Sequence, residues 1–486
     1  MHKIIRTDPR ILWRFVNHRV ALPLAFSMSV PAATIAANRF GLGARPGDIA
    51  AMSADPRGAL RAQLEGGPPL LSAAGLPDSA SLLAQVAELR QEKRQGEAAL
   101  KLGQLYRPVY VEEVRARLQQ GVTTDRPFTE RLVQFWSNHF AVSVDKAAVL
   151  GLAGSLEREA IRPNVLGSFG NLLLAVEQHP AMLLYLDNAR SIGPHSALAL
   201  RAERRAQRLG NAEQKLGLNE NLAREILELH TLGVNGGYSQ GDVTEFAKVI
   251  TGWSIGGGQG QLRSGTPGRF QFRDNLHEPG ARVLLGRRYG ESGLAQGTAV
   301  LHDLAQSPQT ARHLATKLAR HFIADDPPSA AVERLTQAYL DSRGDLPTVY
   351  RALIDAPQAW AVPLAKFKTP SDFVYSSFRA LQAPVPEAGK ALVPFELLGQ
   401  RVYSPGSPAG WPDTSADWDG SSSLFKRLEW ADQIGQRLGS RIDAGERAAD
   451  VLAGVLGADT RTAIAHADSG AQALTLMLAS PEFMRR

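Results

Sequence analysis

The feature that most constrains the fold of this chain is the helical spacing of its apolar residues, which recur every three to four positions over most of its length. Strand signals are confined to residues 269–273 and 282–286, which flank a polar connection and predict a small hairpin. The sequence therefore predicts a mainly α protein: a single large multi-helix unit with one short β-hairpin near residues 269–286. Helices are expected at residues 79–104, 110–120, 131–142, 171–186, 219–232, 242–251, 309–323, 330–342, 346–354, 371–381, 424–438 and 444–455.

The chain has no clean linker and no internal repeat, so we expect one helical domain over residues 33–486. The last of its polar stretches carries Trp411 and Trp418, which are costly to expose, so that stretch should pack against the body of the protein. Flexible inserts rich in polar residues or glycine are expected near residues 189–216, 256–268 and 403–423.

Residues 1–32 precede this domain and share some features with a secretory signal. Basic residues come before an uncharged stretch at residues 20–37, but Pro23 and Pro31 interrupt that stretch. We interpret residues 1–32 as a leader that is partly signal-like, which leaves both a cytoplasmic and an exported (periplasmic) location open. The stretch is too polar to span a bilayer, and no other segment qualifies, so we expect no transmembrane span.

Composition excludes several kinds of site. The chain has no cysteine, which removes disulfides, thiolate nucleophiles and iron–sulfur clusters, so any metal must be held by His, Asp or Glu. A net charge of +6 is small for 486 residues, and no arginine run alternates with aromatic residues, so we expect no nucleic-acid partner. Walker A, G-x-S-x-G and dinucleotide-binding motifs are also missing from the sequence.

The first candidate site residue is His139, in the segment RLVQFWSNHFAV. Stepped at about 100° per residue, it lies in the middle of an apolar arc with Phe135, Trp136 and Phe140, so its side chain should face the core. An imidazole in such a place is hydrogen-bonded, metal-bound or neutral. Two interpretations stay open: a neutral histidine bonded to a carbonyl or carboxylate, and a functional ligand.

A second set of candidates lies in NENLAREILELHTLG, where Glu225 falls on the apolar face of the expected helix. A carboxylate there must be paired, protonated or metal-bound. Glu228 sits just beyond the edge of that face, within reach of Glu225, and His230 borders the opposite edge. The alternatives are a buried salt bridge for Glu225 and a surface pair with Arg224 for Glu228.

A third candidate, His277, lies on the connection between the two predicted strands, three residues after Asp274, a spacing that lets the two side chains meet in a turn. If His139, Glu225 and His277 converge, they suit a divalent metal that activates water or oxygen. Without a metal, His139, Glu225 and Glu228 suit general acid–base catalysis. A solvated loop histidine is the alternative for His277.

Several segments together resemble a known family, the bacterial domain of unknown function 1800. The resemblance implies a bacterial, mostly helical protein without an assigned reaction, whose gene often lies beside one for a protein similar to the alkaline phosphatase/sulfatase superfamily. Relatives usually carry His-Asp where this chain has His277-Glu278, and phenylalanine can stand in the place of His230. The resemblance rests on ANRFGLGARPGD (37–48), RLVQFWSNHFAV (131–142), HPAMLLYLDN (179–188), residues 219–253, HEPGARVLLG (277–286), ARHLATKLARHFIADDPP (311–328), KFKTPSDFVYSSFRAL (366–381) and the segment around Trp411.

Two functions stay open at this point. The first is an enzyme with a buried His/Glu site, with or without a divalent metal. The second is a non-catalytic partner or scaffold for the phosphatase-like neighbour, in which His139 and Glu225 belong to a structural polar network. A haem protein with His139 as its axial ligand is a third alternative.

Overall fold

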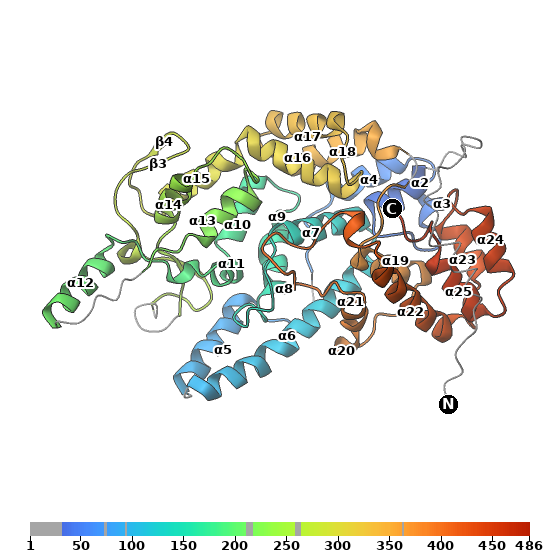
Figure 1. The fold of residues 1–486 in the computed structure, drawn as a ribbon, viewed down its shortest axis with the longest axis horizontal. Helices are drawn as coiled ribbons and strands as arrows, with labels where there is room; N and C mark the ends of the chain where they lie inside the picture. The colour runs from blue at the N-terminus through green and yellow to red at the C-terminus, as the bar shows by residue number, and fades with distance from the viewer. Residues whose placement is uncertain (1–31, 72–74, 93–94, 210–216, 258–263, 362–363) are drawn as a thin grey trace. The chain divides into compact units, whose positions relative to one another are not determined.

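The computed structural model describes residues 32–71, 75–92, 95–209, 217–257, 264–361 and 364–486 (Figure 1). These residues are mainly helical and contain two small antiparallel sheets, which confirms the predicted fold class. The leader expected at residues 1–32 lies outside the described residues, apart from Ala32. Within the described part of the chain, no helix combines the length and apolar composition needed to cross a membrane.

The described residues gather into two compact units. The smaller unit takes its residues from Met1–Ala59, Trp360–Pro384 and Thr414–Arg486, and the larger unit from Leu60–Ala359 and Val385–Asp413. The single domain expected over residues 33–486 stays a prediction.

In the smaller unit, helix α25 packs against α22, α23 and α24. Arg379 is buried in this unit, where its guanidinium donates to the carbonyl of Gly43 and to the carboxylate of Asp48. The elements are α2 (Ala32–Ile35), η1 (Ala36–Phe40), α3 (Asp48–Met52), α19 (Pro370–Leu381), η8 (Ser415–Asp417), α22 (Ser421–Leu438), α23 (Ala444–Val451), α24 (Ala458–Ala465) and α25 (Gly470–Ala479). Helix α4 (Pro56–Glu65) spans the boundary between the units in sequence.

The larger unit holds all the candidate site residues. Its amino-terminal helices are α5 (Ser79–Glu92), α6 (Gln95–Thr123), α7 (Pro127–His139), α8 (Ala153–Leu156), η2 (Glu157–Ile161), α9 (Arg162–Asn164), α10 (Phe169–Glu177), α11 (Pro180–Tyr185), η3 (Asn188–Arg190) and α12 (Ala197–Leu209). Further along the chain are α13 (Asn221–Glu225), η4 (Ile226–His230), α14 (Gln240–Val249), η6 (Asp274–Leu276), α15 (Leu294–Ala305), α16 (Pro308–Phe322), α17 (Ser329–Asp341), α18 (Leu346–Asp355), η7 (Pro357–Trp360), α20 (Ala388–Ala391) and α21 (Val393–Leu397).

Both predicted strands form, but they do not pair with each other. Strand β2 (Phe270–Phe272) pairs with β1 (Trp253–Ile255), and β3 (Arg282–Leu284) pairs with β4 (Arg287–Tyr289). Leu285 and Gly286 both have positive φ, 51° and 76°, which is the backbone of a tight two-residue hairpin turn. This turn gives β3 a nearer partner than β2.

Three short π-helices interrupt the regular helices: η1, η2 and η4. A π-turn holds more residues than an α-turn, so the side chains around it no longer follow steps of 100°. At η4 this widening places His230 fully inside, although regular stepping put it at the edge of the apolar face. Glu225, which regular stepping placed on that face, is only half-buried.

A buried ion network joins α6, α7, η2 and α9, and we call Arg117, Glu130, Glu157 and Arg162 the arginine network. Arg162 donates to both carboxyl oxygens of Glu130, at 2.6 and 2.9 Å, and to Oε1 of Glu157 at 2.7 Å. Oε2 of Glu157 accepts from Arg117 at 2.7 Å, from Ser137 and from Tyr403. Burial opposes the charge on Glu157, but Arg117 and Arg162 outweigh it and hold the pKa of this carboxyl at about 2.

The polar stretches expected as inserts contain ordered structure. Residues 197–209 form α12, no residue of which is buried. Trp418 is buried, and Trp411 is half-buried with its indole N–H donating to the carbonyl of Arg401, as the cost of exposing tryptophan predicted. Residues 258–263 of the second stretch lie outside the described residues, and the flexibility of all three stays a prediction.

Candidate active site

His139 closes α7 and is 1% exposed, which confirms that it faces the core. Its ring packs against Trp136 and Phe140, with ring centroids 5.2 and 4.5 Å away. Nε2 lies 3.2 Å from the carbonyl oxygen of His230, a bond that requires the proton on Nε2 and leaves the lone pair on Nδ1. Nδ1 is buried and has no hydrogen-bond partner among the described residues. Burial, helped by the charge of Lys317, lowers the pKa of His139 well below its usual value, so this imidazole is neutral.

A second buried imidazole, His230, lies beside it with ring centroids 6.1 Å apart. Its Nδ1 is 2.8 Å from Oε1 of Glu177, a fully buried residue at the end of α10. Nε2 of His230 has no hydrogen-bond partner within the described chain. We call His139, Glu177 and His230 the inner group. It contains two buried ring nitrogens without partners, which is rare in a folded protein.

Helix α16 brings three ionisable side chains to the same region. His313, Lys317 and His321 follow one another at intervals of four residues, so they lie along one face of the helix. Nε2 of His313 lies 3.2 Å from the carbonyl oxygen of Leu229, and the His313 ring is 6.3 Å from that of His139. Nδ1 of His321 lies 2.8 Å from Oδ2 of Asp413.

We call His313, Lys317, His321 and Asp413 the outer group, because all four are half-buried while the inner group is fully enclosed. The side chains of His321 and Asp413 are 15% and 24% exposed, although Nε2 of His321 is itself buried. Burial lowers the pKa of Lys317 to about 8, and Asp413 acts in the opposite direction. Burial and the charge of Lys317 lower the pKa of His313 to about 4. Near neutral pH the outer group therefore holds an ammonium group beside a neutral imidazole.

Glu225 is the last residue of α13, and Glu228 lies within η4. Burial raises the pKa of Glu225, with His230 lowering it and Glu228 raising it further. Glu228 accepts a hydrogen bond from the hydroxyl of Tyr238 at 3.3 Å. The surface pair suggested for Glu228 is wrong, because Arg224 pairs with Glu220 instead, at 3.2 Å.

His277 has its own partners. Its Nδ1 lies 3.1 Å from the carbonyl oxygen of Thr251, and its Nε2 lies 3.4 Å from Oε1 of Glu291. The predicted side-chain contact with Asp274 is wrong, because the two residues meet only through a backbone hydrogen bond that closes the η6 turn.

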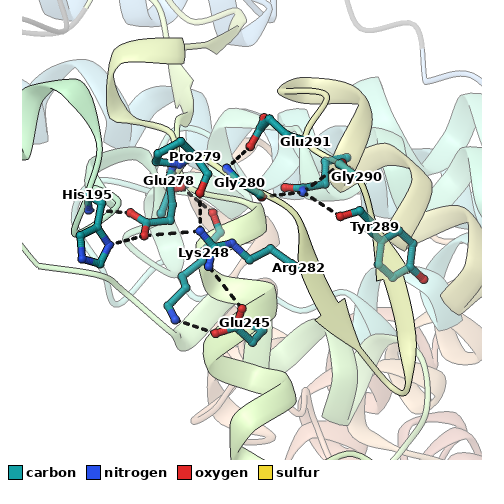
Figure 2. A network of polar contacts seen from close by, with 12 residues as sticks. His195, Glu245, Lys248, Glu278, Pro279, Gly280, Arg282, Tyr289, Gly290 and Glu291 are labelled. Carbon is teal, nitrogen blue, oxygen red and sulfur yellow. Dashed lines mark hydrogen bonds and ion pairs between the residues drawn. The ribbon is translucent and has the colours of Figure 1, made fainter.

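The next residue, Glu278, belongs to the network in Figure 2. Its buried carboxylate accepts a hydrogen bond of 2.7 Å from the backbone N–H of His195 and lies 2.6 Å from Nδ1 of the same residue. Arg282 lies between this carboxylate and that of Glu245, 3.5 Å from each, and Lys248 pairs with Glu245 at 2.6 Å. The network ties the chain just before α12 to β3 and α14.

The three predicted metal ligands contact different residues. In the ranges that the structure describes, no three His, Asp or Glu side chains are arranged to hold a metal ion. His139 contacts His230 and His313, Glu225 lies near His230, and His277 pairs with Glu291. Their roles as metal ligands or catalytic groups stay predictions.

Five residues at this site were not predicted from the sequence: Glu177, His313, Lys317, His321 and Asp413. The i, i+4, i+8 spacing of the three residues on α16 is visible in ARHLATKLARHF and would have placed them on one face. Glu177 and Asp413 had no comparable signal, because each meets its histidine only through the tertiary fold: 53 residues separate Glu177 from His230, and 92 separate His321 from Asp413.

Comparison with known proteins gives a family and no closer relative. The family model described as "Protein of unknown function (DUF1800)" matches residues 35–485. No curated protein and no solved structure matches the chain. The matched region includes all of the larger unit, most of the smaller unit, and every residue of the inner and outer groups. The chain therefore belongs to the DUF1800 family of proteins of unknown function.

Proposed function

We propose that this protein is an enzyme that uses the outer group for general acid–base catalysis, and that its reaction is the hydrolysis of an anionic ester. The observation that carries the proposal is the hydrogen bond of 2.8 Å between His321 and Asp413, with Lys317 one helical turn away on the same face of α16. A carboxylate-bound imidazole next to a cation is a combination that hydrolytic sites use repeatedly.

His321 is the proposed general base. Its Nδ1 proton is donated to Asp413, so the lone pair lies on Nε2, which takes a proton from the attacking water. Asp413 fixes that tautomer and stabilises the imidazolium ion that forms. Both side chains are partly exposed, but Nε2 of His321 is itself buried, so this step requires the attacking water to enter beside the ring.

Lys317 is the proposed anion-binding group. With a pKa of about 8 it carries a positive charge at neutral pH, and partial burial strengthens its interaction with an anion. It attracts the negatively charged substrate and stabilises the charge that develops on the ester oxygen. Its pKa also lies close enough to neutrality for it to return a proton to the leaving group.

The unpaired ring nitrogens of the inner group also support the proposal. Leaving a buried polar atom unpaired costs about 1–3 kcal/mol, and the inner group does so at Nδ1 of His139 and Nε2 of His230. The neutral imidazole of His139 keeps a second positive charge away from Lys317. We propose His139 as a positioning residue, and Glu225 and Glu228 as secondary candidates near His230.

The test is hydrolysis of p-nitrophenyl phosphate, sulfate and acetate by the purified full-length chain. The His321→Asn variant keeps a donor for Asp413 in the place of Nδ1 and removes the base at Nε2. We expect it to lose about 100-fold or more of the hydrolysis of one ester class. His302→Asn is the matched control, because His302 lies on α15 with a side chain that is 72% exposed.

The pH dependence of the same reaction supplies a second readout. Activity that needs the ammonium form of Lys317 should fall as the pH rises above about 8, and Lys317→Met should remove this limb. No hydrolysis of any of the three esters, or equal hydrolysis by wild type and His321→Asn, would contradict the proposal and favour the non-catalytic partner.

A further inference from the structure

Helix α12 carries four arginines on one face: Arg201, Arg204, Arg205 and Arg208. Their spacing of i, i+3, i+4 and i+7 confines them to an arc of about 100° around the helix, which we call the arginine face. All four side chains are exposed, and none forms an ion pair or hydrogen bond with another side chain that the structure describes. Like charges at i, i+4 repel each other, so the fold of this helix gains nothing from the arrangement.

Two exposed leucines flank the arginine face. Leu200 is 36% exposed and Leu209 is 60% exposed, and each lies about 90° around the helix from the centre of the arginine face, on opposite sides. Leu198, Ala202 and Ala206 lie on the same side of the helix as Leu209 and are half-buried. The helix therefore presents cations in the middle and apolar side chains at both edges.

The start of α12 is held firmly although the helix itself is not buried. The buried carboxylate of Glu278 binds His195 through both its backbone N–H and its ring (Figure 2). Gly193 lies so close to Glu278 that an added Cβ would meet the Glu278 backbone at 2.6 Å. The hydroxyl of fully buried Ser196 then accepts from the backbone N–H of Ala199. A helix fixed at its start and exposed along its length can offer one face to a large partner.

We propose that α12 docks this protein onto a membrane surface that contains anionic lipid. The arginine face is complementary to phosphate and carboxylate headgroups, and Leu200 and Leu209 enter the boundary between headgroups and acyl chains. The flanking leucines favour a lipid surface over a nucleic acid, whose phosphate backbone offers them no apolar contact. This inference is independent of the proposed hydrolysis, because α12 contains no residue of the inner or outer group.

The experiment is co-sedimentation of the full-length chain with vesicles of phosphatidylcholine alone and of phosphatidylcholine with phosphatidylglycerol. We expect binding to the anionic vesicles only, and weaker binding at raised salt. Each arginine near an anionic surface strengthens binding by roughly fivefold, so the variant with all four arginines changed to glutamine should bind about 100-fold more weakly or worse. It should keep its helical circular dichroism, since these side chains have no partners in the fold.

The matched control changes four exposed arginines outside α12, Arg288, Arg334, Arg437 and Arg441, to glutamine, which removes the same charge. It should retain most of the binding. The proposal is overturned by equal loss in both variants, by equal binding to neutral and anionic vesicles, or by no binding to either. Binding of a DNA duplex through the arginine face without vesicle binding would overturn it in favour of a nucleic-acid partner.

Discussion

Two polar regions buried in the larger unit differ in how completely their hydrogen bonds are made. In the arginine network every carboxyl oxygen of Glu130 and Glu157 accepts from Arg162 or a neighbour, and Arg162 itself is fully enclosed. In the inner group, Nδ1 of His139 and Nε2 of His230 have no partner among the described residues. A buried network whose hydrogen bonds are all made is accounted for by the stability of the fold. Buried nitrogens without a partner are not accounted for in this way, which makes a chemical role the better explanation.

The largest effect should follow from breaking the saturated region. Arg162→Met leaves two buried carboxylates facing each other without their shared cation, so we expect a loss of about 3–5 kcal/mol in the free energy of unfolding. Urea denaturation measures this loss. Arg334→Met, at an exposed position of α17, is the control and should change the free energy by less than about 0.5 kcal/mol. A loss below about 1 kcal/mol for Arg162→Met would show that the network does not hold this unit together.

The two regions should lose their contributions to the free energy of unfolding at different pH values as the solution is acidified. The pKa of Glu157 is about 2 in the folded chain and 4.5 in the reference state, so the folded state favours its ionised form. The associated stability, about 3 kcal/mol, is fully present above pH 4.5 and is lost as the pH falls towards 2. Glu157→Gln should abolish this loss in a pH series of unfolding free energies.

The inner group should respond earlier in the same series. Since burial keeps His139 neutral in the folded chain, the unfolded chain binds an extra proton once the pH falls below 6.5. Stability tied to His139 is therefore present above pH 6.5 and declines below it, by about 1.4 kcal/mol per pH unit once the unfolded residue is protonated. His139→Gln keeps a donor for the carbonyl of His230 and should remove this slope. An unchanged slope would mean that His139 is not the neutral group described.

The smallest effect should come from His230→Asn. The asparagine amide replaces the Nδ1 donor to Glu177 and removes the unpaired Nε2, so we expect the free energy of unfolding to change by about 1 kcal/mol or less. A loss as large as that of Arg162→Met would erase the difference between the two regions, because it would make Nε2 of His230 a structural atom.

Helix stepping predicted the burial of His139 because α7 is a regular helix from Pro127 onwards. The same stepping failed at His230 and Glu225, because nothing in the sequence marked the wider turn of η4. The apolar and alternating runs identified both predicted strands but not their pairing, since β1 was not recognised as a strand. The pairs His230–Glu177 and His321–Asp413 depend on contacts between distant segments, which one sequence does not reveal.

The carbonyl groups that hold His139 and His313 are those of His230 and Leu229, the last two residues of η4. Such terminal carbonyls have no partner within their own helix, so the two imidazoles serve as its carboxyl-terminal cap. Turning either ring would break its bond to one of these carbonyls, so the orientation of the two imidazoles and the end of η4 depend on each other.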